Sequence, residues 1–133
     1  MKKVLSMAIA FVMLFVVCLT AYADVSTFAI GSSTRTSTLT ISGTTATCTS
    51  IYKDNSNSTT KIVITQTLEK QSFLWTWKTV GGTRTKTVNG STATLTGKVS
   101  GLESGTYRVK TVFKVTADGE TETITVYSAE KEI

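Results

Sequence analysis

The feature that most constrains the fold is the alternation of threonine and other β-branched residues with apolar residues through most of the chain. Threonine occupies 27 of the positions after residue 23, and the chain contains no proline. Because two branches on Cβ restrict a side chain in a helix and suit a pleated strand, this pattern favours strands. No segment carries apolar residues at helical spacing over a sufficient length. We therefore expect an all-β protein, and the regular apolar positions argue against disorder.

The first residues have the three parts of a secretory signal peptide. Lys2 and Lys3 form a basic region, residues 4–19 form an apolar region, and Ala21-Tyr22-Ala23 fits a cleavage site. The apolar run is shorter than the roughly 20 residues that a transmembrane helix needs. We predict a signal peptide over residues 1–23 that is cleaved after Ala23, a secreted protein, and no integral membrane segment in the mature chain.

The residues that follow fit one small β-sandwich. Short alternating segments are separated by turn signals at intervals of roughly 8 to 12 residues, which is typical of a sandwich or barrel. We predict an extended segment over residues 24–33 and a single domain over residues 34–133, an antiparallel two-sheet β-sandwich of seven or eight strands. The predicted strands cover residues 34–41, 45–53, 61–68, 71–80, 83–88, 91–99, 107–116 and 120–128.

Two Asx-Gly dipeptides suit the type I′ turns of β-hairpins, because both central residues of such a turn need a positive φ. Asp118-Gly119 as a two-residue loop sets Phe113 opposite Ile124, and the apolar residues of both strands then share one face. The same rule applied to Asn89-Gly90 sets charged residues opposite apolar ones. Either this second pair has a longer loop, or its two strands belong to different sheets.

The segment Gly101–Thr125, GLESGTYRVKTVFKVTADGETETIT, resembles the last strands of a fibronectin type III or immunoglobulin-like module. Its Glu103-x-Gly105-x-Tyr107 is similar to the D-x-G-x-Y tyrosine corner of those families, with Val109 where the immunoglobulin cysteine stands. This resemblance implies an immunoglobulin or fibronectin III-like sandwich. The whole layout also resembles small secreted β-sandwich proteins of Gram-positive bacteria classed as a domain of unknown function, which implies no particular activity.

Residue types that carry catalysis are scarce. The sequence has no histidine, and Cys48 is the only cysteine after residue 23. A cysteine nucleophile needs a base beside it, so we expect Cys48 to be a small buried residue. Zinc would lack ligands, and Asp54-Asn55-Ser56-Asn57 offers calcium a single carboxylate. Basic residues are dispersed, which argues against nucleic acid. We predict no enzyme, no metal site, no cofactor and no nucleic-acid partner.

The remaining candidates for a site are aromatic side chains that could stack on a ligand, namely Trp75, Trp77, Tyr52 and Tyr127. A loop at residues 69–72, or at 70–71 alone, pairs Gln66 with Trp75 and Ile64 with Trp77. This register keeps the apolar residues of both strands on one face, so we expect both tryptophans to lie mainly in the core. If one of them meets a ligand, Trp75 is the better candidate, because Gln66 opposite it is polar.

Three classes of function stay open. The first is a secreted non-catalytic binding or interaction module of the cell envelope or extracellular space, with a cell-wall polymer, carbohydrate or protein as partner. The second is a self-assembling or inhibitor-type surface protein that pairs through its edge strands. The third is a membrane-acting secreted protein, since hairpins rich in threonine and serine also occur in pore-forming toxins.

Overall fold

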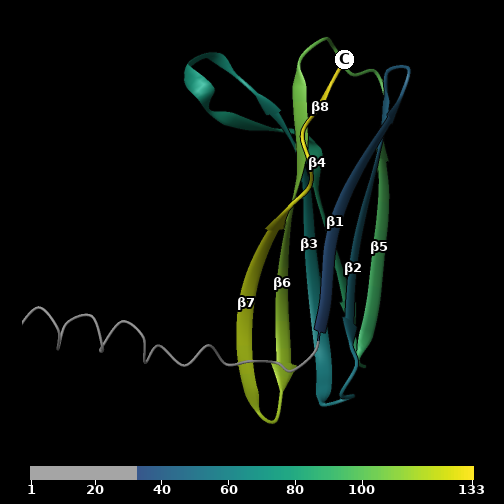
Figure 1. The fold of residues 1–133 in the computed structure, drawn as a ribbon, viewed down its shortest axis with the longest axis vertical. Helices are drawn as coiled ribbons and strands as arrows, with labels where there is room; N and C mark the ends of the chain where they lie inside the picture. The colour runs from purple at the N-terminus through teal and green to yellow at the C-terminus, as the bar shows by residue number, and fades with distance from the viewer. Residues whose placement is uncertain (1–32) are drawn as a thin grey trace, which may run out of the picture.

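The computed structural model of the protein describes residues 33–133, and these consist almost entirely of β-strands (Figure 1). The predicted signal peptide and nearly all of the predicted extended segment lie outside the described residues. Within residues 33–133 there is no α-helix, and hence none with the length and hydropathy to cross a membrane. The elements are β1 (Ser33–Ser42), β2 (Thr45–Asp54), β3 (Thr59–Gln71), the 3-10 turn η1 (Phe73–Trp75), β4 (Trp77–Val88), β5 (Thr92–Val99), β6 (Thr106–Ala117), β7 (Glu120–Tyr127) and β8 (Lys131–Glu132).

The strands form two antiparallel sheets that pack face to face, as Figure 1 shows. One sheet has the strand order β1-β2-β5, and the other has the order β4-β3-β6-β7 with β8 paired to the start of β6. The predicted all-β sandwich is therefore confirmed. β4 pairs with β3, as the added strand C′ of a variable-type immunoglobulin domain pairs with strand C, whereas in constant-type domains the fourth strand pairs with the fifth. This strand order is that of a fibronectin type III-like sandwich.

The strands form because their apolar residues recur at every second position. β2 and β6 show this most clearly, since buried and half-buried residues alternate along nearly their whole length. The face predicted for β2 is confirmed, because its inward residues are all inaccessible to solvent: Ala46, Cys48, Ser50 and Tyr52. One face of each sheet is therefore buried between the layers, as an antiparallel sandwich requires.

The core between the sheets has two apolar clusters. Tyr52, Ile64 and Phe113 belong to the first, and Cys48, Leu68 and Val109 belong to the second. On each of the strands β2, β3 and β6, one inward polar residue stands between a residue of the first cluster and a residue of the second. These three polar residues are Ser50, Gln66 and Thr111.

Hydrogen bonds join these polar side chains across the core. The hydroxyl of Thr111 lies 2.7 Å from that of Ser50 and 2.9 Å from that of Ser37 on β1. Gln66 donates from Nε2 to the Ser50 hydroxyl at 2.8 Å and to the backbone carbonyl of Leu95 at 3.1 Å. The resulting polar belt links both sheets at the boundary between the apolar clusters. It gives partners to the three hydroxyls and to Nε2 of Gln66, whose burial without partners would cost free energy.

Both expectations about the Asx-Gly dipeptides are resolved by the strand pairing. β6 and β7 pair with Phe113 opposite Ile124, which confirms the two-residue loop at Asp118-Gly119. The strands on either side of Asn89-Gly90 belong to different sheets, because β4 pairs with β3 and β5 pairs with β2. The second of the two alternatives is therefore correct, and the chain crosses between the layers there.

The similarity to a tyrosine corner extends to its hydrogen bond. Tyr107 is buried at the start of β6, and its hydroxyl donates to the backbone carbonyl of Glu103 at 2.6 Å. In immunoglobulin-like sandwiches the corresponding hydroxyl bonds to backbone a few residues upstream. This contact ties the segment that precedes β6 to the strand itself.

Candidate binding site at the tip of the β3–β4 hairpin

The hairpin of β3 and β4 extends beyond the body of the sandwich and projects away from it (Figure 1). The pairing runs from Ile62 opposite Val88 to Gln71 opposite Trp77. Its register shifts between Thr67 and Leu68, so that two residues of β4 have no partner there. Such a bulge bends and twists a strand pair.

The two unpaired residues are Gly81 and Gly82, with φ of 70° and 79°. Glycine takes this left-handed conformation without the steric penalty that a Cβ brings. Gly81 also lies against β5, since a Cβ there would come within 2.8 Å of the side chain of Val99. From the sequence, a strand is predicted to end at this dipeptide. That prediction is wrong, because the glycines form a bulge inside β4 and not a turn at its end.

The loop that closes the hairpin, residues 72–76, is held together by its own hydrogen bonds. The backbone N–H of Ser72 donates to the carbonyl of Thr76 at 2.7 Å, and the two hydroxyls lie 2.6 Å apart. Thr76 also donates from its hydroxyl to the carbonyl of Phe73 at 3.2 Å. Leu74 and Trp75 have φ of 67° and 62°, a conformation that non-glycine residues adopt at a cost of about 1 kcal/mol or more each.

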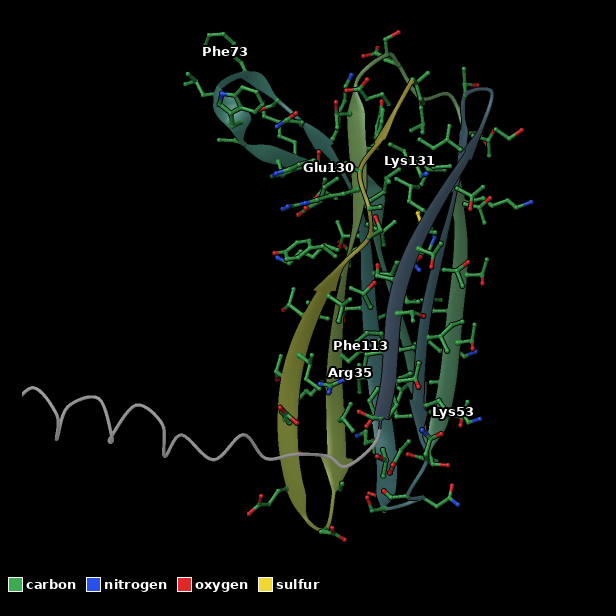
Figure 2. The ribbon with its side chains drawn as sticks, viewed as in Figure 1. Arg35, Lys53, Phe73, Phe113, Glu130 and Lys131 are labelled. Atoms are coloured by element: carbon green, nitrogen blue, oxygen red, sulfur yellow. The ribbon has the colours of Figure 1, made fainter. Side chains whose placement is uncertain are left out.

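This closed loop holds three large apolar side chains in solvent. Phe73 is 87% exposed, Leu74 is 74% exposed and Trp75 is 83% exposed. Figure 2 places Phe73 at the far end of the projecting hairpin. We call these three residues the tip. Among the described large apolar residues the next most exposed is Tyr127, at 47%.

The register predicted for the two tryptophans is wrong. β3 continues to Gln71, so the loop lies several residues later than expected and Gln66 pairs with Arg84. The pairing of Leu68 with Val80 sets the distal register, and Trp77 then falls opposite Gln71. Trp75 belongs to the loop and stands in solvent, and Trp77 is half-buried on the outer face of the sheet. Neither ring enters the core.

A stack of side chains braces the base of the hairpin against the body. The guanidinium of Arg108 on β6 lies over the ring of Trp77, 4.0 Å from its centre, and over the ring of Tyr127 on β7, 4.2 Å from its centre. Arg108 also donates from Nε to a carboxylate oxygen of Glu69 on β3 at 2.8 Å. Each ring contact contributes about 0.5–2 kcal/mol. Four strands therefore meet at one guanidinium.

A second contact lies beside this brace. The ammonium of Lys70 stands 5.8 Å from the centre of the Tyr107 ring and 3.6 Å from the carboxylate of Glu103. Gly105 leaves room for the lysine side chain, since a Cβ there would come within 2.5 Å of it. The hairpin is thus held to the segment before β6 as well as to the outer face of β6 and β7.

The four aromatic candidates have three different positions. Arg108 brings Trp77 and Tyr127 together at the base of the hairpin, and Trp75 lies at its tip. Tyr52 lies apart from them in the core, where it is fully buried and its ring centre is 5.9 Å from that of Phe113. The ring of Tyr52 is therefore inaccessible to a ligand. The accessible candidates are Trp75 at the tip and, in part, Trp77 and Tyr127 at the base of the hairpin.

The reactive side chains elsewhere in the described residues serve the fold. Cys48 is fully buried, and burial raises the pKa of its thiol. The hydroxyl of Ser56 donates to the Asp54 carboxylate at 2.6 Å, and this bond together with those from the backbone N–H groups of Ser56 and Thr59 holds the pKa of Asp54 well below its usual range. Within residues 33–133, no three histidine, cysteine, aspartate or glutamate residues gather as metal ligands would.

Sequence reasoning missed three residues of the site: Phe73, Leu74 and Arg108. The run Phe73-Leu74-Trp75 breaks the alternation of a strand, and this break is the signal that a loop lies there. Arg108 occupies an outward position between the buried residues Tyr107 and Val109. No pattern in the sequence shows that two aromatic rings from other strands stack on it.

The chain matches no family model and no curated protein. Solved structures that resemble it include two crystal forms of wild-type OgpA from Akkermansia muciniphila, with TM-scores of 0.45 and 0.41 and 11% identity. A third is catalytically inactive OgpA in complex with an O-glycopeptide substrate, with a TM-score of 0.40 and 14% identity. The matches cover 73%, 76% and 73% of this chain. The chain spans little more than a quarter of the length of OgpA, 28% to 29%. Likeness at this level carries no argument about activity.

Proposed function

We propose that this protein is a secreted, non-catalytic binding module of the cell envelope or extracellular space, and that it binds its partner through the tip of the β3–β4 hairpin. The observation that carries the proposal is the exposure of three consecutive large apolar side chains on a closed loop. Phe73, Leu74 and Trp75 are each about three-quarters exposed or more. Monomeric proteins rarely expose contiguous apolar patches larger than a few hundred Å², and the largest patch on a monomer is often functional.

The free energy of burying the tip side chains also supports a binding role for the tip. Burying a side chain of this size against a partner contributes about 1.5–3 kcal/mol relative to leaving it in water. The fold obtains none of that stabilisation, and the left-handed backbone of Leu74 and Trp75 adds a cost of its own. A segment that contributes no burial and carries backbone strain is typical of a functional site, where a partner supplies the missing burial.

The brace explains how the tip would be presented. A two-stranded hairpin on its own is marginally stable in water. Here Arg108 fixes the base of the hairpin to β6 and β7 through Trp77, Tyr127 and Glu69. An ordered arm loses less conformational entropy when it binds than a flexible one does. The brace therefore favours binding by the tip without contributing a contact to the partner.

A binding comparison tests the proposal. Labelled mature chain is incubated with peptidoglycan, chitin, mucin and membrane fractions, beside the double variant Phe73→Ser/Leu74→Ser. The control is Val112→Thr, which replaces a half-buried valine on the outer face of β6. We expect the wild type and the control to bind one of these materials and the tip variant to lose most of that binding. Binding of the tip variant at the wild-type level, or no binding of the wild type to any of them, contradicts the proposal.

The same samples test the self-assembly alternative. Light scattering after size exclusion gives the mass of the wild type and of the tip variant in solution. The proposal predicts a monomer for both. A wild-type oligomer that becomes monomeric in Phe73→Ser/Leu74→Ser would mean that the tip binds a second copy of this chain.

A further inference from the structure

We infer that the partner of the tip is a lipid bilayer, and that Phe73, Leu74 and Trp75 insert into its interfacial region. This inference rests on the proposed function, because it takes the tip as the binding element. The shape of the tip favours a bilayer. It is the end of a narrow arm, and Figure 2 shows nothing of the sandwich body beside Phe73. A soft interface accepts such an end without a matching pocket.

The residue types at the tip are those of membrane interfaces. Tryptophan is enriched where hydrocarbon meets headgroups, because its ring is largely apolar and its N–H is polar. Amphipathic helices that lie in the interface bury tryptophan, phenylalanine and leucine about 5–10 Å into this boundary. Phe73, Leu74 and Trp75 supply one of each, and all three are exposed.

Several polar groups of the loop are paired within it, which lowers the cost of inserting the loop into a bilayer. Backbone groups that enter the apolar region without partners cost several kcal/mol each, so inserted segments must satisfy them internally. In this loop the N–H of Ser72 bonds to the carbonyl of Thr76, and the hydroxyl of Thr76 bonds to the carbonyl of Phe73. The hydroxyls of Ser72 and Thr76 also bond to each other. A protein partner, by contrast, would use free polar groups for directional contacts.

Two lysines stand where the headgroups would lie. Lys70 and Lys78 are paired directly across the hairpin, each three residues from the tip. Even at the full strand rise of about 3.3 Å per residue, the pair lies no more than about 10 Å behind the tip. That distance falls within the depth to which interfacial segments insert, and it places the exposed Lys78 ammonium near the lipid phosphates.

The local charge balance adds a preference for anionic lipid. The carboxylate of Glu103 lies 3.6 Å from the Lys70 ammonium, and Glu69 is bound to Arg108, so these charges largely cancel. Lys78 is exposed and leaves a net positive charge at this level. Each lysine near an anionic surface strengthens binding by about fivefold.

Tryptophan fluorescence with vesicles tests the inference. In Trp77→Phe the only remaining tryptophan is Trp75. We expect its emission to shift to shorter wavelength with vesicles of phosphatidylcholine and phosphatidylglycerol, and brominated lipid to quench it. In the Trp77→Phe background, Phe73→Ser and Leu74→Ser each weaken binding by about tenfold. Lys78→Gln weakens it by about fivefold on anionic vesicles and leaves it unchanged on phosphatidylcholine alone.

Lys53→Gln is the matched control, because Lys53 is also an exposed strand lysine and lies at the other end of the body from the tip (Figure 2). We expect it to bind as the parent does. Absence of the wavelength shift, or no quenching by brominated lipid, overturns the inference. If the tip variants lose binding to wall polymer or protein while vesicles are not bound, the proposed function stands and the lipid partner is wrong. If the tip variants bind everything as the wild type does, both are wrong.

Discussion

The guanidinium of Arg108 lies over the ring of Trp77, at 4.0 Å from the ring centre, and so joins the projecting hairpin to the outer face of β6. Tyr127 covers the guanidinium at 4.2 Å, and Glu69 binds it through Nε. An outward-facing tryptophan therefore has a structural role that does not require the core. This relationship explains why Trp77 is half-buried although it faces away from the other sheet.

Replacing Arg108 with alanine should loosen the hairpin before it unfolds the sandwich. The change removes two ring contacts and leaves the Glu69 carboxylate without its partner, for a cost of about 1–3 kcal/mol. Hydrogen exchange should quicken at the amides of the distal hairpin and stay slow in β2 and β6. The control is Lys114→Ala, an exposed residue of the same strand. Equal protection of the distal hairpin in both variants would contradict the bracing role.

The polar belt should behave as one coupled unit. Ser50→Ala removes the hydroxyl that accepts from Gln66 and meets Thr111, and it leaves two buried polar groups short of a partner. We expect a loss of about 1–3 kcal/mol in the free energy of unfolding, measured with urea. Gln66→Leu should cost less in the Ser50→Ala background than in the wild type. Strictly additive losses would show that the two residues do not interact.

Asp54 should make stability depend on pH. Its bonds from the Ser56 hydroxyl and the backbone N–H groups of Ser56 and Thr59 lower its pKa in the folded state. A carboxyl with a lowered folded pKa stabilises the protein above its unfolded pKa, near 4, and this stability is lost as pH falls further. We expect Asp54→Asn to be less stable than the wild type at neutral pH, with the difference shrinking below about pH 4. A difference that stays constant from neutral to acidic pH would contradict this account.

The tyrosine corner predicts a contrast between two tyrosines. Tyr107→Phe removes the 2.6 Å bond to the Glu103 carbonyl and should lower the free energy of unfolding by about 1 kcal/mol. Tyr127→Phe keeps the ring that stacks on Arg108 and should be nearly neutral. Urea unfolding of both variants gives the comparison. A larger loss in Tyr127→Phe than in Tyr107→Phe would mean that the corner contributes little.

The strands and one hairpin were predictable because their signals are local. Alternation fixes which residues of β2 and β6 point inward, and the short Asp118-Gly119 loop fixes the register of β6 and β7. The register of the β3–β4 hairpin was not predictable, because it depends on a bulge at Gly81-Gly82 and on a longer loop than the pattern suggests. An apolar residue that stacks on an arginine or stands in solvent looks the same in sequence as one that packs in a core.

The candidate site was hard to predict for the same reason: sequence does not distinguish a buried apolar residue from an exposed one. Sequence singled out Trp75 and Trp77, but it placed them inside because burial is the usual position of an indole beside aliphatic residues. Phe73 and Leu74 looked like the start of a strand, whereas the backbone of Leu74 turns into a left-handed conformation. The tip thus emerges only when the closure of the loop by Ser72 and Thr76 is known.

The most direct test of the account is the environment of Trp75 in the free protein. In Trp77→Phe, fluorescence comes from Trp75 alone. Because Trp75 is 83% exposed, we predict emission at the wavelength of indole in water and nearly unhindered quenching by acrylamide. A short-wavelength emission that acrylamide barely quenches, in a monomeric sample without lipid, would place Trp75 in the core and contradict the account.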